Sequence, residues 1–233
     1  MPFYEREEKL MRILSSEKTI STRELAKKLY VSLPTLRRDL IKLENKGLIT
    51  RSHGKAVLTQ KSADYTIPFI LRETEQGVAK LKMARLAAEH IKDGYTIFLD
   101  ASTSAYCIVP HLAEFGNIVA ITSGAKTSLL LAQYGISNIC TGGKMINGSF
   151  SYIGCDAISV ISKYNADIAF FSCRGLSSEG VPSDTSTEEN DIRRAMIKNS
   201  KKKILLCDSH KTGKTYLNNL CEPEEIDFII SDI

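Results

Sequence analysis

The sequence contains no tryptophan and no stretch that approaches the ~20 consecutive apolar residues of a membrane-spanning helix. Its opening segment, MPFYEREEKL, is charged where a secretory signal peptide would be apolar. These absences argue against membrane proteins and secreted proteins. We therefore expect a soluble, cytoplasmic protein without a membrane partner.

Closely spaced metal ligands are also lacking. The six cysteines occur singly inside apolar runs, without a C-x-x-C spacing, and the four histidines are scattered. A disulfide framework or a zinc site needs grouped ligands, whereas isolated cysteines are typical of buried thiols in a reducing compartment. We expect no metal and no cofactor, and a buried position for Cys107, Cys140, Cys155, Cys173, Cys207 and Cys221.

Positive charge is concentrated in the first quarter of the chain. Residues 1–60 carry 13 Lys and Arg against 7 Asp and Glu, whereas the remainder carries 18 against 20. A basic segment joined to a near-neutral body is typical of a protein whose first part binds a polyanion. A solvated charged surface without a partner would show the same asymmetry, so charge alone does not decide between them.

Three helices are predicted in this basic segment. Glu5–Ser16 has apolar residues at helical spacing. Ser21 and Glu24 stand at the capping-box spacing that starts a second helix. A third helix begins at Ser32, after a very short turn that contains Tyr30. Two helices joined by such a turn are typical of a helix-turn-helix motif.

The third helix has two different sides. Leu33, Leu36, Leu40 and Leu43 form a stripe that we expect to face a core. Gly47 is expected to end the helix. The opposite side is basic and has small residues at its N-terminal end, as entry into the major groove requires. A simple helical bundle would explain the leucine stripe but not this basic side. The residues expected to meet DNA from this helix are Ser32, which is also the expected N-cap, Pro34, Thr35, Arg37, Arg38 and Lys42.

A β-hairpin is predicted after the third helix. Residues 48–51 and 56–58 can pair as two short strands, which would form the wing of a winged helix-turn-helix. The turn between them carries Arg51, His53 and Lys55, placed to touch phosphate or a minor groove. We predict this DNA-binding domain over residues 1–58 and an ordered linker over residues 59–73.

Residues 74–233 alternate between helical segments and strands that are apolar on both faces. Helices are expected at 75–92, 104–112, 125–133, 155–163 and 187–199, and strands at 96–100, 118–122, 136–140, 168–172, 203–208 and 226–231. This alternation predicts a parallel sheet covered by helices on both faces, that is, a Rossmann-like α/β domain.

Ligands of such sheets bind beyond the carboxyl ends of the strands, so the residues there are the candidate site. Five loops at this edge are small, hydroxylated, glycine-bearing or charged, and their residues suit a phosphate, sugar hydroxyls or an anionic group. Turns in general favour the same residue types, which is the alternative for any single loop. The candidates are Asp100, Ser102, Thr103, Ser104, Thr122, Ser123, Gly142, Gly143, Lys144, Arg174, Gly175, Asp208 and Lys211.

The first domain resembles the DNA-binding signature of the DeoR family of bacterial transcriptional regulators. The matching residues are Glu24–Ala26, Val31-Ser32, Thr35–Leu40, Leu43-Glu44, Gly47 and Arg51–Gly54. The chain departs from the family at Lys55, where a second glycine is common, and at Tyr30, where the family has a turn glycine. A tyrosine in a left-handed turn would cost on the order of 1 kcal/mol, so we expect a differently shaped turn here.

The second domain is similar to the DeoR-type sensor domain at Asp93-Gly94, Asp100–Ser104, Thr122-Ser123, Gly142-Gly143, Gly154, Asp167, Gly175, Gly180, Asp208, Lys211 and Gly213. The resemblance also matches Arg72 and one of Glu188 or Glu189. It implies a fold like that of ribose-5-phosphate isomerases and CoA transferases, and a phosphorylated sugar or related metabolite as inducer. Ser102, Ser123 and residues 210–212 depart from the family pattern in the expected effector pocket.

Two functions are weighed from the sequence. The first is a DNA-binding regulator, expected to be a repressor of a sugar-metabolism operon, that acts as a dimer or tetramer on double-stranded operator DNA and senses a phosphorylated sugar. Nothing in the residues distinguishes a repressor from an activator. The alternative is a sugar-phosphate isomerase with a DNA-binding appendage, in which Asp100, Asp208, Glu188 and Lys211 would serve as acid and base. The loop 172–175 is poor in bases, which disfavours this enzyme.

Overall fold

A computed structural model of the chain describes residues 3–17, 19–45, 48–52, 54–58 and 68–233. The chain divides into two compact units, Met1–Glu75 and Gln76–Ile233. The predicted helix end at Gly47, the wing residue His53 and the linker segment 59–67 lie outside the described residues. In the part of the chain that is described, no helix combines the length and the apolar character needed to cross a membrane.

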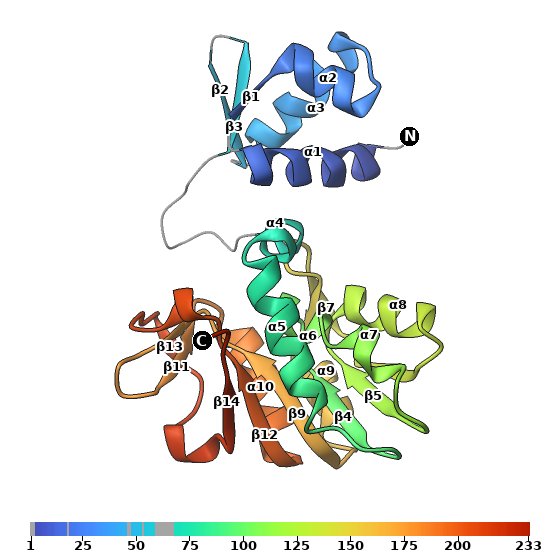
Figure 1. Ribbon diagram of the computed structural model, residues 1–233, viewed down its shortest axis with the longest axis vertical. Helices are drawn as coiled ribbons and strands as arrows, with labels where there is room; N and C mark the ends of the chain where they lie inside the picture. Colours follow the sequence, from blue (N-terminus) through green and yellow to red (C-terminus); the bar gives the residue numbers. More distant parts are fainter. Residues whose placement is uncertain (1–2, 18, 46–47, 53, 59–67) are drawn as a thin grey trace. The chain divides into compact units, whose positions relative to one another are not determined.

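The first unit is a winged helix-turn-helix (Figure 1). Its helices are α1 (Phe3–Glu17), α2 (Thr22–Leu29), α3 (Leu33–Asn45) and α4 (Phe69–Thr74), and its strands are β1 (Thr19–Ser21), β2 (Ile49–Ser52) and β3 (Lys55–Leu58). The predicted pairing of β2 with β3 is confirmed, and β1, which the sequence did not reveal, adds to β3 on the other side in an antiparallel sheet.

The leucine stripe of α3 forms the centre of this unit's core. Leu36, Leu40 and Leu43 are fully buried and pack with apolar residues of α1, α2, β1 and α4. Leu33 was predicted to belong to the stripe but is 40% exposed, because it is the first residue of α3 and stands between exposed Ser32 and Pro34. The predicted N-cap of α2 is confirmed, since the Ser21 hydroxyl accepts a hydrogen bond from the Glu24 N–H at 3.2 Å.

The second unit is built on a six-stranded parallel sheet with the strand order β14-β12-β9-β4-β5-β6. The strands are β4 (Thr96–Leu99), β5 (Val119–Thr122), β6 (Ser137–Cys140), β9 (Ala166–Ser172), β12 (Ser200–Leu206) and β14 (Phe228–Ile230). Alternate residues of each strand enter opposite layers of the core: Ile97 and Leu99 of β4 pack on one side and Phe98 packs on the other. The predicted α/β class is confirmed.

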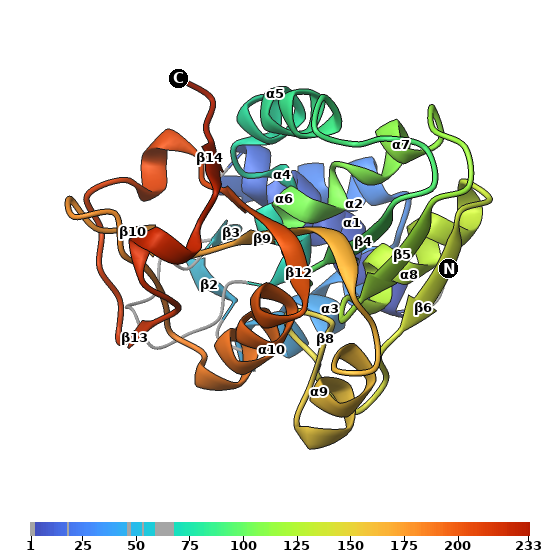
Figure 2. The same ribbon diagram turned by 90° about the horizontal axis from the view of Figure 1, so that it is seen from below.

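Helices cover both faces of the sheet, which is seen between them in Figure 2. One face carries α5 (Gly77–Ala88), α6 (Thr103–Tyr106), α7 (Val109–Leu112) and α8 (Ala125–Gln133), and the other carries α9 (Cys155–Ile161) and α10 (Thr187–Lys198). The helix predicted over 104–112 is therefore two short helices, and the helix predicted over 75–92 is shorter at both ends.

Two small sheets were not predicted. A hairpin of β7 (Lys144–Ile146) and β8 (Ser151–Ile153) follows β6, and β10 (Gly175–Leu176), β11 (Pro182–Asp184) and β13 (Asn218–Asn219) form an antiparallel sheet after β9. Short 3-10 turns, η1 (Ser209–Lys211) and η2 (Pro223–Glu225), precede and follow β13. The two small sheets and η1 stand at or near the carboxyl ends of the main strands, whereas η2 directly precedes the amino end of β14.

The cysteine prediction holds only in part. All six thiols are free, but Cys173 and Cys207 alone are buried. Cys107, Cys140 and Cys221 are half-buried, and Cys155 is exposed at the start of α9, where only one side of the helix packs on the sheet.

Candidate functional site

One side of α3 presents an exposed cationic surface. Ser32, Pro34, Arg37, Arg38 and Lys42 are exposed, and Thr35 is half-buried beside Ser32, whose hydroxyl lies 2.9 Å from the Thr35 hydroxyl. Neither Arg37 nor Arg38 makes a hydrogen bond or an ion pair with any described residue. Both guanidinium groups therefore keep all their donors for an external acceptor.

A buried ion pair fixes α3 against α1. The Arg6 guanidinium donates to both carboxylate oxygens of Asp39, from Nε to Oδ2 at 2.7 Å and from Nη2 to Oδ1 at 3.0 Å. The hydrogen bond to Asp39 raises the pKa of Arg6. Paired, two-point contacts of this kind restrict orientation as well as distance. No pattern in the sequence marks this pair, because its members are 33 residues apart.

A second ion pair joins the end of α3 to the wing. The Glu44 carboxylate accepts from the Arg51 N–H at 3.2 Å and from Arg51 Nε at 2.7 Å. The hydrogen bond from the Arg51 side chain lowers the pKa of Glu44. Arg51 is also predicted to touch the DNA backbone, and in the structure its side chain, which is 36% exposed, pairs with Glu44. Lys55 is exposed on β3, and Lys42 Nζ lies 4.2 Å from the centre of the Phe3 ring.

The turn between α2 and α3 is left-handed. Tyr30 has φ 54° and ψ 44°, so the expectation of a differently shaped turn is wrong. The conformation is held by backbone hydrogen bonds from the Tyr30 N–H to Lys27 O and from the Val31 N–H to Ala26 O. These bonds close the helix as they would with glycine, and they leave the steric cost of about 1 kcal/mol in place.

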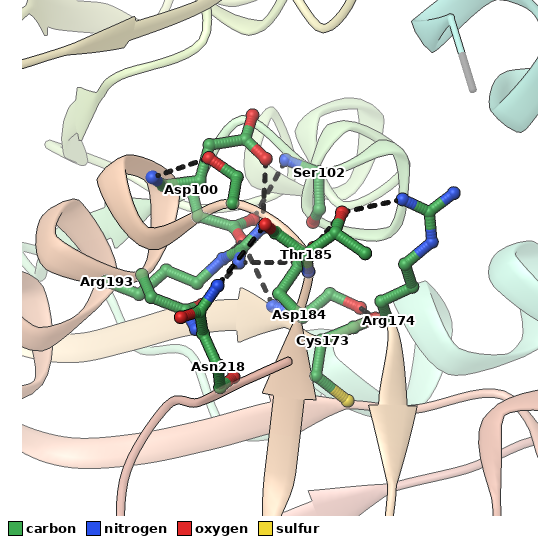
Figure 3. A network of polar contacts seen from close by, with 12 residues as sticks. Asp100, Ser102, Cys173, Arg174, Asp184, Thr185, Arg193 and Asn218 are labelled. Carbon is green, nitrogen blue, oxygen red and sulfur yellow. Dashed lines mark hydrogen bonds and ion pairs between the residues drawn. The ribbon is translucent and has the colours of Figure 1, made fainter. Parts of the chain in front are cut away.

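In the second unit, Asp100 and Arg193 form the centre of a buried polar network (Figure 3). Asp100 Oδ1 accepts from the Ser102 N–H at 3.0 Å, and Oδ2 accepts from the Ser172 N–H at 3.1 Å and from Arg193 Nε at 2.9 Å. Arg193 Nη1 donates in turn to Asp184 Oδ2 at 2.8 Å. Asp100 was expected to face a sugar hydroxyl, but its carboxylate is used within the protein.

Charge balance explains why this network tolerates burial. Burial opposes the charge of Arg193, but the carboxylates of Asp184, Asp100 and Glu189 raise its pKa above the ordinary value. Burial likewise opposes the charge of Asp184, and Arg193 lowers the Asp184 pKa in spite of it. Sequence reasoning did not identify Arg193 or Asp184, because α10 and β11 show no motif that marks them.

Lys211 and Asp208 pair with each other at the end of β12. Lys211 Nζ lies 3.3 Å from Asp208 Oδ2 and donates to Ser172 Oγ at 2.9 Å. Arg174 Nη1 donates to Thr185 Oγ1 at 2.9 Å, and its guanidinium lies 5.5 Å from the centre of the Tyr216 ring. The loops after β9 and β12 therefore bring Arg174 and Lys211 to the same edge of the sheet, as predicted, with Asp208 engaged by Lys211.

Several predicted site residues serve the local backbone. The Ser102 hydroxyl caps α6 by accepting from the Ala105 N–H, and the Thr122 hydroxyl accepts from the Gly124 N–H. At Gly175, a side chain would collide with the backbone of Lys214. Gly143 has φ 104° and lies against Ile153 O of the hairpin. Gly142 lies beside it in the same turn, Thr103 is buried in α6, and Lys144 is exposed on β7.

Four buried hydroxyl groups have no hydrogen-bond partner within the described residues. They belong to Ser104, Ser123, Thr127 and Ser149, each at most 2% exposed. They come from α6, from the loop after β5, from the first turn of α8 and from the β7–β8 hairpin. A buried polar group without a partner costs about 1–3 kcal/mol, so such a group in a native protein calls for an explanation. We call these four residues the hydroxyl cluster.

Backbone contacts place the β7–β8 hairpin against the start of α8. The Ala125 N–H donates to Phe150 O at 2.9 Å, and the Tyr152 N–H donates to Ser123 O at 2.7 Å. A Cβ on Gly124 would lie 2.7 Å from the Thr127 hydroxyl and 3.2 Å from the Ala101 Cα, so both groups lie close to Gly124. Ser104 and Ser123 were predicted as site residues. Thr127 and Ser149 were missed, because a single hydroxyl in a helix or in an unpredicted hairpin carries no signal in the sequence.

Known protein families match both units. Residues 6–62 match the DeoR-like helix-turn-helix domain, and residues 75–233 match the DeoR C terminal sensor domain. The chain is 33% identical over 232 residues to the HTH-type transcriptional regulator GolR of Listeria innocua, covering 98% of this chain and 90% of GolR. It is 34% identical to the HTH-type transcriptional repressor GlcR of Bacillus subtilis, covering 97% of this chain and 88% of GlcR.

Another relative is named as an activator, whereas GlcR is named as a repressor. The L-fucose operon activator of Escherichia coli is 28% identical, covering 97% of this chain and 94% of the activator. These relatives are transcriptional regulators and not enzymes, which confirms the expectation for this chain. Among solved structures, ribose 5-phosphate isomerase A of Methanocaldococcus jannaschii is similar with a TM-score of 0.43 and 19% identity, covering 57% of this chain and 53% of the isomerase.

Proposed function

This chain belongs to the DeoR family of helix-turn-helix transcriptional regulators, and we propose that it represses a sugar-metabolism operon and responds to a phosphorylated sugar. The single observation that carries the proposal is the presence, in one chain, of two sets of polar side chains without hydrogen-bond partners among the described residues: exposed cations on α3 and buried hydroxyls in the second unit. Arg37 and Arg38 on α3 lack acceptors among the described residues, and the hydroxyl cluster lacks hydrogen-bond partners there. The exposed cations suit a polyanion, and the buried hydroxyls suit a small polyoxygenated ligand.

The DNA contact follows from the exposure and the charge of α3. Thr35, Arg37 and Arg38 read base edges in the major groove, since recognition helices use such N-terminal residues. Ser32, Pro34, Lys42, His53 and Lys55 meet the backbone. The DNA-binding domain spans residues 1–58 and the effector domain residues 74–233, joined by residues 59–73. Double-stranded operator DNA is bound by a homo-oligomer, because one such domain covers too little DNA for specificity.

The effector lies at the carboxyl edge of the sheet. The hydroxyl cluster supplies neutral donors and acceptors, while Lys144, Arg174 and Lys211 supply positive charge for a phosphoryl group or a related anion. Asp100 and Asp208 act indirectly, by holding Arg193 and Lys211. A repressor is preferred because GlcR, at 34% identity, is one. The activator remains the alternative, and the position of the operator relative to the promoter decides it. The protein works in the cytoplasm, where operator and metabolite are both found.

The test uses the full-length chain. A duplex that the protein selects from random sequences serves as the DNA probe, and thermal shift screens a panel of triose, pentose and hexose phosphates with inorganic phosphate as a control. We expect tight, salt-dependent binding of the selected duplex. We also expect one class of sugar phosphate to raise the unfolding temperature and to change the DNA affinity. A protein that selects no duplex at low ionic strength would contradict the proposal.

A further inference from the structure

Tyr30 stands in a backbone conformation that carries a steric penalty for any residue with a side chain. Its φ of 54° places it in the left-handed region, at the C-terminal end of α2. Glycine adopts this conformation freely, and asparagine tolerates it better than tyrosine does. Tyr30 therefore carries a backbone penalty that glycine at the same position would not carry.

The Tyr30 side chain makes no compensating contact within the described residues. It is 95% exposed, and neither its ring nor its hydroxyl interacts with another described side chain. A large aromatic group with a polar tip is therefore held fully in solvent. Aromatic residues of this kind bury a large area when they find a partner, and a tyrosine hydroxyl then usually finds a hydrogen-bond acceptor.

The surroundings of Tyr30 indicate which partner fits. It precedes the N-terminal end of α3, which begins three residues later at Leu33 and whose first turn holds the Ser32–Thr35 hydroxyl pair. Lys27, three residues before Tyr30, is exposed, and Leu33, three residues after it, is 40% exposed. Positive charge, hydroxyl groups and a small apolar surface at the entrance of a recognition helix suit a sugar–phosphate backbone, which offers both apolar deoxyribose and anionic oxygen.

We propose that Tyr30 contacts the DNA backbone beside the groove that α3 enters, with its ring against a deoxyribose and its hydroxyl donating to a phosphate oxygen. The inference rests on the proposed DNA binding and goes beyond it. Tyr30 is a positioning residue: it fixes the register of α3 without reading a base. Its donor is neutral, so it adds affinity without adding a released counterion.

The experiment compares the full-length wild-type chain with Tyr30→Gly and Tyr30→Phe on two duplexes. One duplex is selected by the wild-type protein from random sequences, and the other is a scrambled version of it. Tyr30→Gly should weaken binding of both duplexes by about five- to tenfold, as expected for the loss of one hydrogen bond and a packed ring. The affinity of Tyr30→Phe for each duplex should lie between those of the wild type and Tyr30→Gly. The salt dependence of binding should be the same for all three proteins.

The unfolding temperature provides the readout that a purely structural role would not give. Tyr30→Gly should unfold at the same temperature as the wild type or higher, because the steric penalty is removed. Affinity and stability therefore change in different directions. Arg38→Ala is the control variant: it should lose the preference for the selected duplex and reduce the salt dependence.

Three results would overturn the inference while leaving the DNA-binding function intact. The first is unchanged affinity of Tyr30→Gly for both duplexes. The second is a loss confined to the selected duplex, which would make Tyr30 a base reader. The third is a loss of affinity together with a lower unfolding temperature, or with reduced self-association in sedimentation without DNA. Failure of the wild type to bind any duplex would instead remove the proposed DNA-binding function itself.

Discussion

Arg193 is a buried cation surrounded by the carboxylates of Asp100, Asp184 and Glu189. Each of these carboxylates comes from a different part of the second unit: the end of β4, β11 and the α10 helix itself. The guanidinium therefore joins the main sheet to the small antiparallel sheet. The Asp184 pKa is lowered in the folded protein, so the stabilisation from this carboxylate is present above its ordinary pKa and is lost as the pH falls through the folded value.

Arg193→Met should lower the free energy of unfolding by about 3–5 kcal/mol at pH 7, because it leaves buried carboxylates without their cation. The loss should be smaller near pH 4, where the carboxylates of the variant take up protons. Denaturant unfolding, monitored by circular dichroism at pH 7 and at pH 4, measures the loss of unfolding free energy at each pH. Lys201→Met, which removes an exposed partner of Asp167, is the control and should change little. An equal loss at both pH values would contradict the electrostatic explanation.

Thr127→Val tests the hydroxyl cluster without changing the shape of the side chain. Because the Thr127 hydroxyl is buried and has no partner among the described residues, its removal should leave the unfolding temperature unchanged or raise it. The sugar phosphate that stabilises the wild type should then be needed at about five times the concentration or more, since one ligand hydrogen bond is lost. Thermal-shift titration measures both effects.

Ser128→Ala is the matched control for this variant. Ser128 lies next to Thr127 on α8, but its hydroxyl donates to Asn138 Oδ1 at 2.7 Å. The control should unfold at a lower temperature and keep the wild-type ligand titration. If the two variants lost ligand affinity equally, the hydroxyl cluster would not be the binding surface.

At the scale of elements, the β7–β8 hairpin and the wing are both held in place by contacts with a neighbouring helix. Each is a short antiparallel pair that folds back over the N-terminal region or the end of a helix: the hairpin against α8, and the wing against α3. Short hairpins are marginal by themselves, so both depend on these contacts. The hairpin brings Ser149 to the hydroxyl cluster, and the wing carries Lys55.

Some elements of the fold could be predicted from the sequence and others could not. The six parallel strands could be predicted because buried strands are continuous apolar runs, and the carboxyl-edge rule then selected Ser104 and Ser123, whose hydroxyls are buried without a partner among the described residues. The β7–β8 hairpin could not, because β7 and β8 have three residues each and lack a repeating pattern. Arg193 and Asp184 were missed for another reason: a buried ion network depends on which elements meet, and periodicity does not report that.

Glu44→Gln should reduce the preference for the selected duplex over the scrambled one. The substitution keeps the size of the side chain but releases the Arg51 guanidinium, so the wing is no longer fixed on α3. The released cation can bind phosphate of any sequence, and the salt slope for the scrambled duplex should therefore steepen by about 1. Fluorescence anisotropy over a range of salt concentrations measures this.

Glu114→Gln removes an equivalent charge from the second unit and serves as the control, because its partner, His111, lies on α7. Unchanged discrimination between the two duplexes in Glu44→Gln would mean that the wing is oriented by its own strands and not by this ion pair.

At the scale of the whole molecule, two compact units divide the chemistry between them. Each has its own apolar core, so each can be altered without unfolding the other. Coupling between them, in the proposed function, arises only because the effector prefers one arrangement of the DNA-binding domains over another. A variant of one unit should therefore leave the intrinsic affinity of the other unchanged when its own ligand is absent.

Arg38→Ala in the full-length chain is expected to abolish discrimination between the selected and the scrambled duplex, at a cost of about 1–3 kcal/mol for the lost base contact. Without DNA, the same variant should show the wild-type thermal shift with the sugar phosphate. Retained discrimination would remove Arg38 from the recognition surface. An altered thermal shift would show instead that the two units are coupled even in the free protein.

The hydroxyl cluster has a consequence for redesign. The side-chain hydroxyls of Ser104, Ser123, Thr127 and Ser149 make no hydrogen bond within the described part of the fold. In the proposed function, exchanging these side chains for other small ones would change what is recognised while preserving the scaffold. A library restricted to these four positions would search chemical selectivity without losing most of its members to misfolding. The same chain could in this way become the starting point for transcriptional biosensors that report metabolites of other classes.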